Sequence, residues 1–216
     1  MKIRFDTRPG VDTRRWECLL EVYCTPENET PGELLQRGWL FDPLKDAWYM
    51  SRSVRVDLSR WMMSKSEIDS LRSYEWEETQ ELSSEDAETL AEYRREREIV
   101  DYPYSSFEKY GALKIERGLS KFGSCWYMTS HFGSTSLYPI CAYRKSGTKT
   151  SPGKACWTRA CQVSKEMGST HLYVYEGYGL GSAYKASTRG FEWWNGEAWS
   201  TDAGDYLEVL KRDGVI

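Results

Sequence analysis

The sequence predicts an α+β fold in which a mixed, mainly antiparallel sheet is flanked by helices. Three runs rich in β-branched and aromatic residues, Leu113–Arg117, Ser124–Ser130 and Leu137–Tyr143, are separated by glycines and predict antiparallel strands. A helical run then opens at Ser151, with a proline at its first helical position, and the apolar segment His171–Glu176 follows as a buried strand. Strands followed by a helix and a further strand are typical of α+β domains.

A smaller unit is expected before this sheet. Residues 1–15 are charged and predict an irregular arm, whereas Glu17–Cys24 alternates weakly, as a strand does. The segment Thr30-Pro-Gly-Glu33 has capping-box spacing, which predicts a short helix from about Pro31 to Arg37. The aromatic residues of Trp39–Met50 predict a hairpin.

The remaining elements follow from local patterns. Ser53–Leu58 alternates cleanly and predicts a strand, after which residues 60–73 mix serines with basic residues. Residues 84–99 predict a helix whose Glu and Arg side chains form a solvated face. Near the end of the chain, Gly190–Trp199 predicts a hairpin that turns at an Asn-Gly pair, and residues 203–211 predict a final helix.

Composition limits the kinds of partner that the protein can have. The 216 residues carry 29 Lys and Arg against 33 Asp and Glu, a net charge of −4, so a nucleic acid would need a local basic patch. The 6 cysteines include no Cys-x-x-Cys pair and there are 2 histidines, which predicts reduced thiols and no metal site. The N-terminus lacks the apolar core of a signal peptide, and no apolar run approaches the roughly 20 residues of a membrane span, which predicts a cytoplasmic protein without a membrane partner.

Two neighbouring backbone features outline a cleft. The helix that starts after Ser151-Pro-Gly153 offers free N–H groups and the positive end of a helix dipole to an anion. The strand His171–Glu176 ends in Gly177, Gly179 and Gly181, which let a ligand approach the backbone closely. An ordinary connection between a helix and a strand, with a turn after it, is the alternative interpretation.

Segments near the C-terminus resemble a known family. These segments are Tyr173–Leu180, Ser182–Ala186, Gly190–Glu192 and Gly196–Trp199. They are similar to the C-terminal motif series of the aminoacyl-tRNA–protein transferases, which include the arginyltransferases and the bacterial leucyl and arginyl transferases of the N-degron pathway.

Earlier segments resemble the same family in the same order. They are Leu34–Trp39, Ala47–Tyr49, Ser53–Asp57, Ser64–Ser66 with Arg72, and Ser151–Gly153. The family's N-terminal cysteine pairs are not reproduced, and Ala183 stands where the family has a methionine. The resemblance covers most of the chain, and the order and spacing of its motifs carry it.

The resemblance implies a fold and a reaction. It implies a catalytic region with a GNAT-like acyltransferase fold at residues 101–216, preceded by an arginyltransferase-like α+β region at residues 1–100. The implied activity moves an amino acid of the Arg or Leu type from tRNA to the α-amine of a protein or peptide. No cofactor is implied, because aminoacyl-tRNA is itself the co-substrate.

Two alternatives to this reaction remain. One is a GNAT N-acyltransferase that uses an acyl-coenzyme A such as acetyl-CoA. The glycines of Arg144–Gly153 lack the spacing of the coenzyme A pyrophosphate loop in such enzymes, which favours the tRNA-dependent reaction. The other alternative is a non-catalytic family member that binds a peptide or RNA.

The implied reaction assigns roles to residues around the cleft. An amine attacks an ester carbonyl, so the protein must position both substrates, deprotonate the amine and stabilise the oxyanion. We expect Glu176 to bind or deprotonate an amino group, Tyr178 or Tyr184 to protonate the leaving ribose oxygen, and Lys185 to hold a phosphate or an acidic side chain. The alternatives are a rim carboxylate or ion pair for Glu176, and aromatic core with a surface lysine for the others.

Further residues are expected to bind the substrates. The residues predicted to bind the donor or acceptor are Ser151, Gly153, Tyr175, Gly177 and Trp194. The residues predicted to follow the tRNA backbone are Arg52, Arg55, Arg60, Lys65, Arg72, Lys149 and Lys154. A scattered, solvated set of surface charges is the alternative for the second group.

Overall fold

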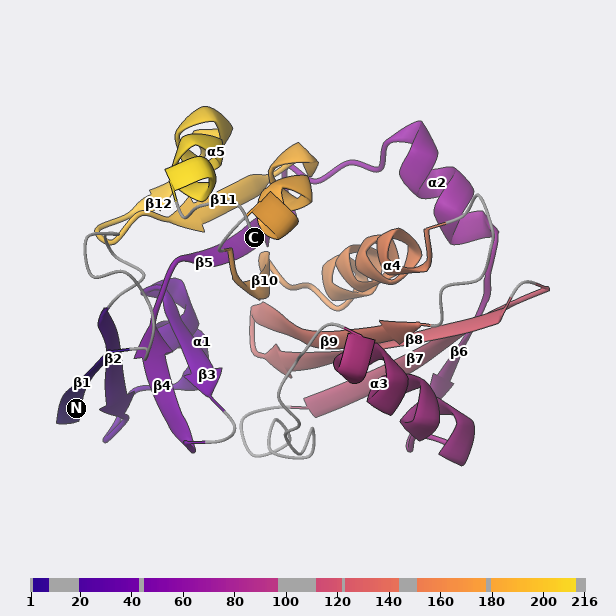
Figure 1. Cartoon of the computed structure of the whole chain (residues 1–216), viewed down its shortest axis with the longest axis horizontal. Helices are drawn as coiled ribbons and strands as arrows, with labels where there is room; N and C mark the ends of the chain where they lie inside the picture. The colour runs from indigo at the N-terminus through magenta and orange to yellow at the C-terminus, as the bar shows by residue number, and fades with distance from the viewer. Residues whose placement is uncertain are drawn as a thin grey trace.

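A computed structural model gives the arrangement of the chain in space (Figure 1). It describes residues 2–7, 20–42, 45–96, 112–121, 123–143, 151–177 and 180–212. These residues form two β-sheets with helices packed against them.

The larger sheet forms the centre of the fold. Its strands are β5 (Ser53–Asp57), β6 (Glu75–Thr79), β7 (Ala112–Ser120), β8 (Gly123–Phe132), β9 (Thr135–Tyr143), β10 (His171–Glu176), β11 (Phe191–Trp194) and β12 (Trp199–Ser200). They lie in the order β12-β11-β5-β10-β9-β8-β7-β6. The pairs are antiparallel except for β9 and β10, which run parallel. The predicted α+β class, with a mixed and mainly antiparallel sheet, is therefore confirmed.

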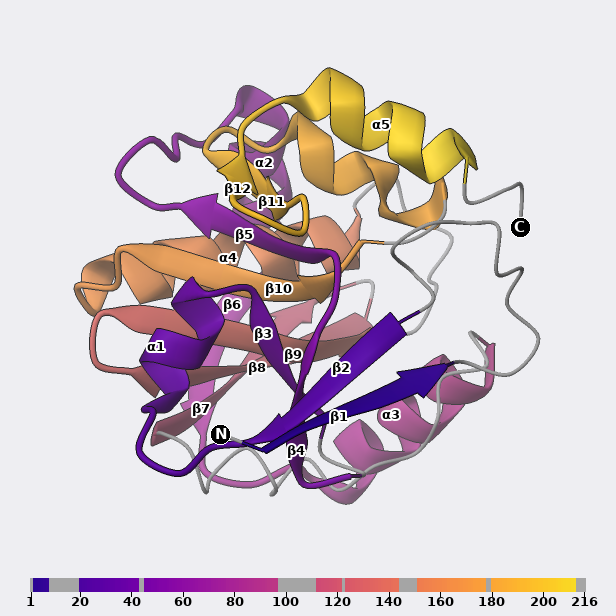
Figure 2. The same ribbon diagram turned by 90° about the vertical axis from the view of Figure 1, so that its left-hand side faces the viewer.

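The smaller sheet holds the N-terminal strands, which lie toward the viewer in Figure 2. Its strands are β1 (Lys2–Thr7), β2 (Leu20–Thr25), β3 (Trp39–Asp42) and β4 (Ala47–Met50), in the order β1-β2-β4-β3. The hairpin of β3 and β4 is as predicted. The irregular arm predicted for residues 1–15 is wrong over β1, because this charged segment pairs with β2, from Lys2 with Thr25 to Thr7 with Leu20.

Helices cover both faces of the larger sheet. They are α1 (Pro31–Gln36), α2 (Lys65–Arg72), α3 (Ser84–Glu96), α4 (Pro152–Glu166), the 3₁₀ segment η2 (Leu180–Ser187) and α5 (Ala203–Arg212). The capping box predicted for α1 is present. The sequence did not predict α2, although its Ser64 and Glu67 form a capping box of the same kind.

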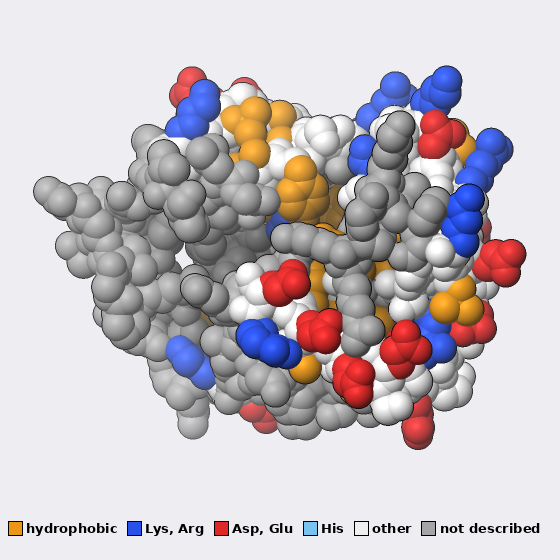
Figure 3. All heavy atoms as spheres, turned by 45° about the vertical axis from the view of Figure 1, so that its right-hand side comes forward, with side chains coloured by type: hydrophobic (Ala, Val, Ile, Leu, Met, Phe, Trp, Pro, Cys, Tyr) orange, Lys and Arg blue, Asp and Glu red, His pale blue; other side chains and the backbone are white. Residues whose placement is uncertain are grey.

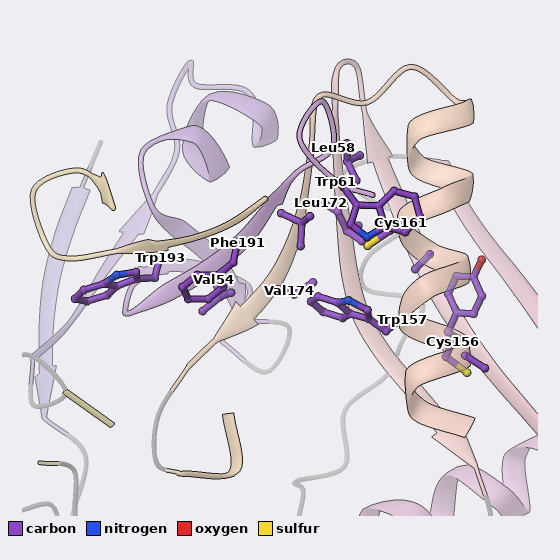
Figure 4. Packing of buried hydrophobic residues seen from close by; sticks show 14 of the residues in the cluster. Val54, Leu58, Trp61, Cys156, Trp157, Cys161, Leu172, Val174, Phe191 and Trp193 are labelled. Atoms are coloured by element: carbon purple, nitrogen blue, oxygen red, sulfur yellow. The ribbon is translucent and has the colours of Figure 1, made fainter. Parts of the chain in front are cut away.

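Three clusters of buried side chains hold these layers together. Leu90 of α3 packs on one face of β7–β9, in a cluster with Trp126 and Met128 of β8. Side chains of α4 pack on the other face, and Figure 4 shows Trp157 of α4 beside Val174 of β10. The third cluster joins α1, β3 and β4 to β9 and β10. The four cysteines whose side chains are described are free, as predicted for reduced thiols.

Strands from both halves of the chain share the larger sheet. β5 lies between β10 and β11, and β6 pairs with β7. The boundary predicted near residue 100 lies outside the described residues, but the strands on either side of it are hydrogen-bonded neighbours. No helix in the described part of the chain is long and apolar enough to span a membrane.

Candidate active site

A cavity of about 720 Å³ lies where β9 and β10 separate. The two strands pair only between Thr135–Leu137 and His171–Tyr173, and β9 continues to Tyr143 paired with β8 but not with β10. Beyond Tyr173 the register of β10 against β5 shifts, and Tyr175 has a positive φ of 60°. This break turns β10 away from β9, and residues of α2, α3, α4, β9 and η2 line the space that results.

The first turn of α4 forms one wall of the cavity. Ser151 is the N-cap, and its Oγ accepts a hydrogen bond from the Lys154 backbone N–H at 3.4 Å. A Cβ atom at Gly153 would lie 3.0 Å from the Tyr143 ring, so glycine lets that ring close against the helix start. The Lys154 Nζ donates to Ser66 Oγ at 3.1 Å, which places a cation beside the positive end of the helix dipole. This wall suits an anionic group such as a phosphate.

Aromatic side chains form another part of the cavity wall. The Trp157 ring lies edge-on to the rings of Tyr138 and Tyr184, with centroids 5.9 and 6.3 Å apart, and Tyr93 meets Tyr143 at 5.2 Å. Burial raises the pKa of Tyr138 well above its ordinary value. The Tyr184 side chain is 61% exposed to the open cavity, yet the protein atoms around it raise its pKa to about 12. Both phenols are therefore protonated at neutral pH and can donate a hydrogen bond.

Four of the predicted site residues share this cavity. Ser151, Gly153, Lys154 and Tyr184 all line it, which joins the helix start to the segment that follows the glycine-rich end of β10. Their common position supports the cleft interpretation over an ordinary helix–strand connection.

Lys185 points away from this cavity. Its side chain is 8% exposed, and its Nζ donates to the Val174 carbonyl oxygen at 3.0 Å, which ties η2 to β10. It is therefore a buried anchor, which matches neither the predicted contact to a phosphate or acidic side chain nor the alternative of a surface lysine. The Glu176 backbone pairs with Ser53 at the end of β10, but its side chain lies outside the described residues, as do Tyr178 and Lys149.

The other predicted substrate-binding residues lie in packed surroundings. Tyr175 donates its hydroxyl to the Phe41 carbonyl oxygen at 3.1 Å. A Cβ atom at Gly177 would overlap the Tyr206 hydroxyl, and the Trp194 ring sits against Gly38. These residues hold β10 and β11 against neighbouring elements and do not line the cavity.

The predicted basic strip is not a continuous surface. Arg52 is 3% exposed and donates to the Gly177 carbonyl oxygen at 3.4 Å. Arg55 pairs with Glu192 at 2.6 Å and lies over the Trp199 ring at 4.0 Å. Arg52, just before β5, is buried, and Arg55 is half-buried because β5 is an inner strand of the larger sheet.

Arg60 is likewise paired within the protein. It forms ion pairs with Asp57, at 2.6 Å, and with Glu192. Partial burial favours the protonated form of Asp57, but hydrogen bonds from Ser59 and Arg60 outweigh it and lower the pKa of Asp57 to about 2. Of the seven basic residues predicted to meet tRNA, Arg60, Lys65, Arg72 and Lys154 are exposed among those described, and Arg60 is held in ion pairs within the protein.

Several cavity residues were not predicted as site residues. They are Ser64, Ser66, Glu67, Tyr93, Tyr138, Cys141, Tyr143, Trp157, Ser187 and Thr188. The local signal for Glu67 was its capping-box spacing from Ser64. The position of α2 beside α4 depends on long-range packing, which local patterns do not show.

β7 to β10 form a mixed, mainly antiparallel sheet with α4 packed on one face. No protein-family model and no curated protein matches the sequence. Among solved structures, the chain is similar to L-PGS from Bacillus licheniformis, with 16% identity and a TM-score of 0.42 over 66% of this chain and 48% of that chain. It is also similar to a C-terminal domain (DUF2156) from Agrobacterium fabrum, of a protein assigned as a lysylphosphatidylglycerol synthetase, with 8% identity and a TM-score of 0.44 over 73% of this chain and 55% of that chain.

A third similar structure is a GCN5-related glucosamine N-acetyltransferase region of a fungal multi-domain GH3 β-N-acetylglucosaminidase. Its identity is 13% and its TM-score 0.40, over 78% of this chain and 22% of that chain. The chain thus spans about half the length of the first two structures and less of the third. These likenesses concern the fold alone and say nothing of the substrate.

Proposed function

We propose that this protein is an acyltransferase that takes an amino acid from an aminoacyl-tRNA and joins it to the α-amine of a protein or peptide. The observation that carries the proposal is the cavity at the separation of β9 and β10, which the first turn of α4 enters. Its Lys154 wall suits a phosphate of the tRNA end, and its aromatic wall suits the adenosine or the amino acid.

The chemistry requires little beyond placement. The ester of an aminoacyl-tRNA is already activated, so holding the amine against its carbonyl supplies much of the rate enhancement. Tyr184, protonated at neutral pH, is placed to donate a proton to the leaving ribose oxygen or to stabilise the oxyanion. Transfer of an acyl group from acyl-coenzyme A remains the second candidate, because its phosphates would suit the same helix start.

Transfer assays separate the candidates. Purified protein is incubated with a peptide panel and either labelled aminoacyl-tRNA or labelled acetyl-coenzyme A. The proposal predicts labelled peptide with aminoacyl-tRNA and none with acetyl-coenzyme A. Label from acetyl-coenzyme A alone would establish the second candidate, and label from neither, with peptide or RNA still bound, would indicate a non-catalytic binding protein.

Replacing Lys154 by methionine should weaken tRNA binding across all sequences. The variant removes one phosphate-facing cation, so the slope of log K against log salt should become shallower by about 1. Binding measured by fluorescence anisotropy over a salt series tests this, with Lys211→Met on the exposed face of α5 as the control. An unchanged slope in Lys154→Met would remove this residue from the tRNA contact.

A further inference from the structure

A largely buried carboxylate that lines the cavity has no cation partner in the described part of the chain. Glu67, in the first turn of α2, lines the cavity and is 9% exposed. Its Oε2 accepts the Ser64 backbone N–H at 2.7 Å, and the Ser64 Oγ accepts the Glu67 N–H at 3.3 Å. This capping box fixes the side chain, and the described residues offer its other oxygen, Oε1, neither a hydrogen bond nor an ion pair.

The surroundings of Glu67 favour a cation. Burial first, and then the negative charge of Glu67, raise the pKa of the Cys161 thiol, so this charge acts within a weakly screened interior. The rings of Tyr93, Tyr138 and Tyr184 line the same cavity, and aromatic faces attract ammonium groups. The nearby Lys154 ammonium donates to Ser66 and forms no ion pair with Glu67. Figure 3 shows hydrophobic side chains within a hollow of the surface, with basic side chains above it and acidic ones below.

The Glu67 side chain is largely buried, but its Oε1 is not among the fully buried atoms that lack a hydrogen bond, so a ligand in the cavity can reach it. A cation there would form a charge-assisted hydrogen bond, which is among the stronger contacts a site can make. The Lys154 wall and Glu67 together present one cation and one anion to a single space of about 720 Å³. That pattern complements a ligand that carries both a phosphate and an ammonium group.

We propose that Glu67 binds an ammonium group of the substrate and so selects for an amine in the cavity. This rests on the proposed function, in which the aminoacyl group and the acceptor each carry an amine. The sequence predicted this role for Glu176, at the end of β10, whereas Glu67 belongs to α2.

Three small esters test the proposal without requiring catalysis. Methyl hexanoate has no amine, norleucine methyl ester adds an α-ammonium, and lysine methyl ester adds a second ammonium at the end of the same chain. Their affinities are measured by calorimetry at about pH 6.5, below the pKa of an α-amino group. We expect at least one added ammonium to strengthen binding about tenfold or more in the wild-type protein. The step that gains affinity identifies which amine Glu67 binds.

The decisive variant is Glu67→Gln, because its amide oxygen can still accept the Ser64 N–H while the charge is lost. Glu33→Gln is the matched control, since Glu33 forms the same capping box in α1, with the Thr30 N–H at 2.8 Å, on an exposed surface. The gain should vanish in Glu67→Gln and persist in Glu33→Gln. Equal affinity for the three esters, or a gain that survives in Glu67→Gln, would overturn the proposal.

This result is independent of transfer activity. An ammonium gain that depends on Glu67, without amino-acid transfer, would leave the binding role intact and remove the proposed function. Transfer that continues unchanged in Glu67→Gln would do the reverse. Thermal unfolding of both variants shows whether each retains its cap, because a lost cap lowers the stability of either helix.

Discussion

Replacing Arg159 by methionine is expected to lower the free energy of unfolding by about 3 kcal/mol, because it leaves the buried Glu116 carboxylate with the more distant Lys114 ammonium, 3.6 Å from its Oε1, as its cation partner. Arg159, in the middle of α4, forms a two-point ion pair with Glu116 of β7, from Nε to Oε2 at 2.8 Å and from Nη2 to Oε1 at 3.1 Å. Glu116 is 3% exposed and also accepts the Tyr127 hydroxyl at 2.5 Å. This ion pair holds α4 against the sheet, and the first turn of α4 lines the cavity.

Urea unfolding measures this effect, and a double-mutant cycle assigns it to the pair. The variant Arg159→Met/Glu116→Gln removes the charge as well as its partner, so it should recover part of the loss. Arg189→Met, at an exposed arginine, should change stability by less than about 0.5 kcal/mol. A loss below about 1 kcal/mol in Arg159→Met would show that the pair does not hold α4 in place.

Replacing Gly190 by alanine is expected to destabilise the protein strongly. Gly190 has a φ of 82°, in the left-handed region, where an L side chain costs about 1–2 kcal/mol. A Cβ atom there would also overlap the carbonyl oxygen of Asp57, and backbone cannot move aside as a flexible side chain can. The Asp57 N–H donates to the Gly190 carbonyl oxygen at 2.8 Å, so the clash falls where η2 leads into β11 beside β5. We expect a loss of about 3 kcal/mol or more.

Gly196→Ala separates the two causes. Gly196, in the turn between β11 and β12, has a φ of 104°, but nothing lies within 4 Å of the position that its Cβ would take. It should lose only the conformational part, about 1–2 kcal/mol. Equal losses in the two variants, measured by thermal unfolding, would contradict the close approach of β5 to Gly190.

Local patterns predicted the elements whose signals are local. The cap at Ser151, the capping box of α1 and the Asn-Gly turn between β11 and β12 each depend on a few adjacent residues. The same holds for the approach of Ser151 and Lys154 to Tyr184, since α4, β10 and η2 follow one another directly in the chain.

Contacts between residues far apart in the chain determine the features that local patterns did not predict. The alternation of Ser53–Leu58 predicted the strand β5, in which Val54 and Val56 are buried and Arg55 lies on the other face. Trp199 and Glu192 cover that face, so Arg55 is half-buried and paired. Glu67 likewise gave only a capping signal, because its place in the cavity depends on the packing of α2 against α4.

The most direct test is a crystal structure of the protein with a 3′-aminoacylamino analogue of aminoacyl-adenosine, whose amide replaces the reactive ester. The ligand should lie where β9 and β10 separate, with its amino acid against Trp157 and Tyr184 and its ammonium group at Glu67. Binding on another face, or an analogue that does not bind while the protein remains folded, would contradict a substrate site in this cavity.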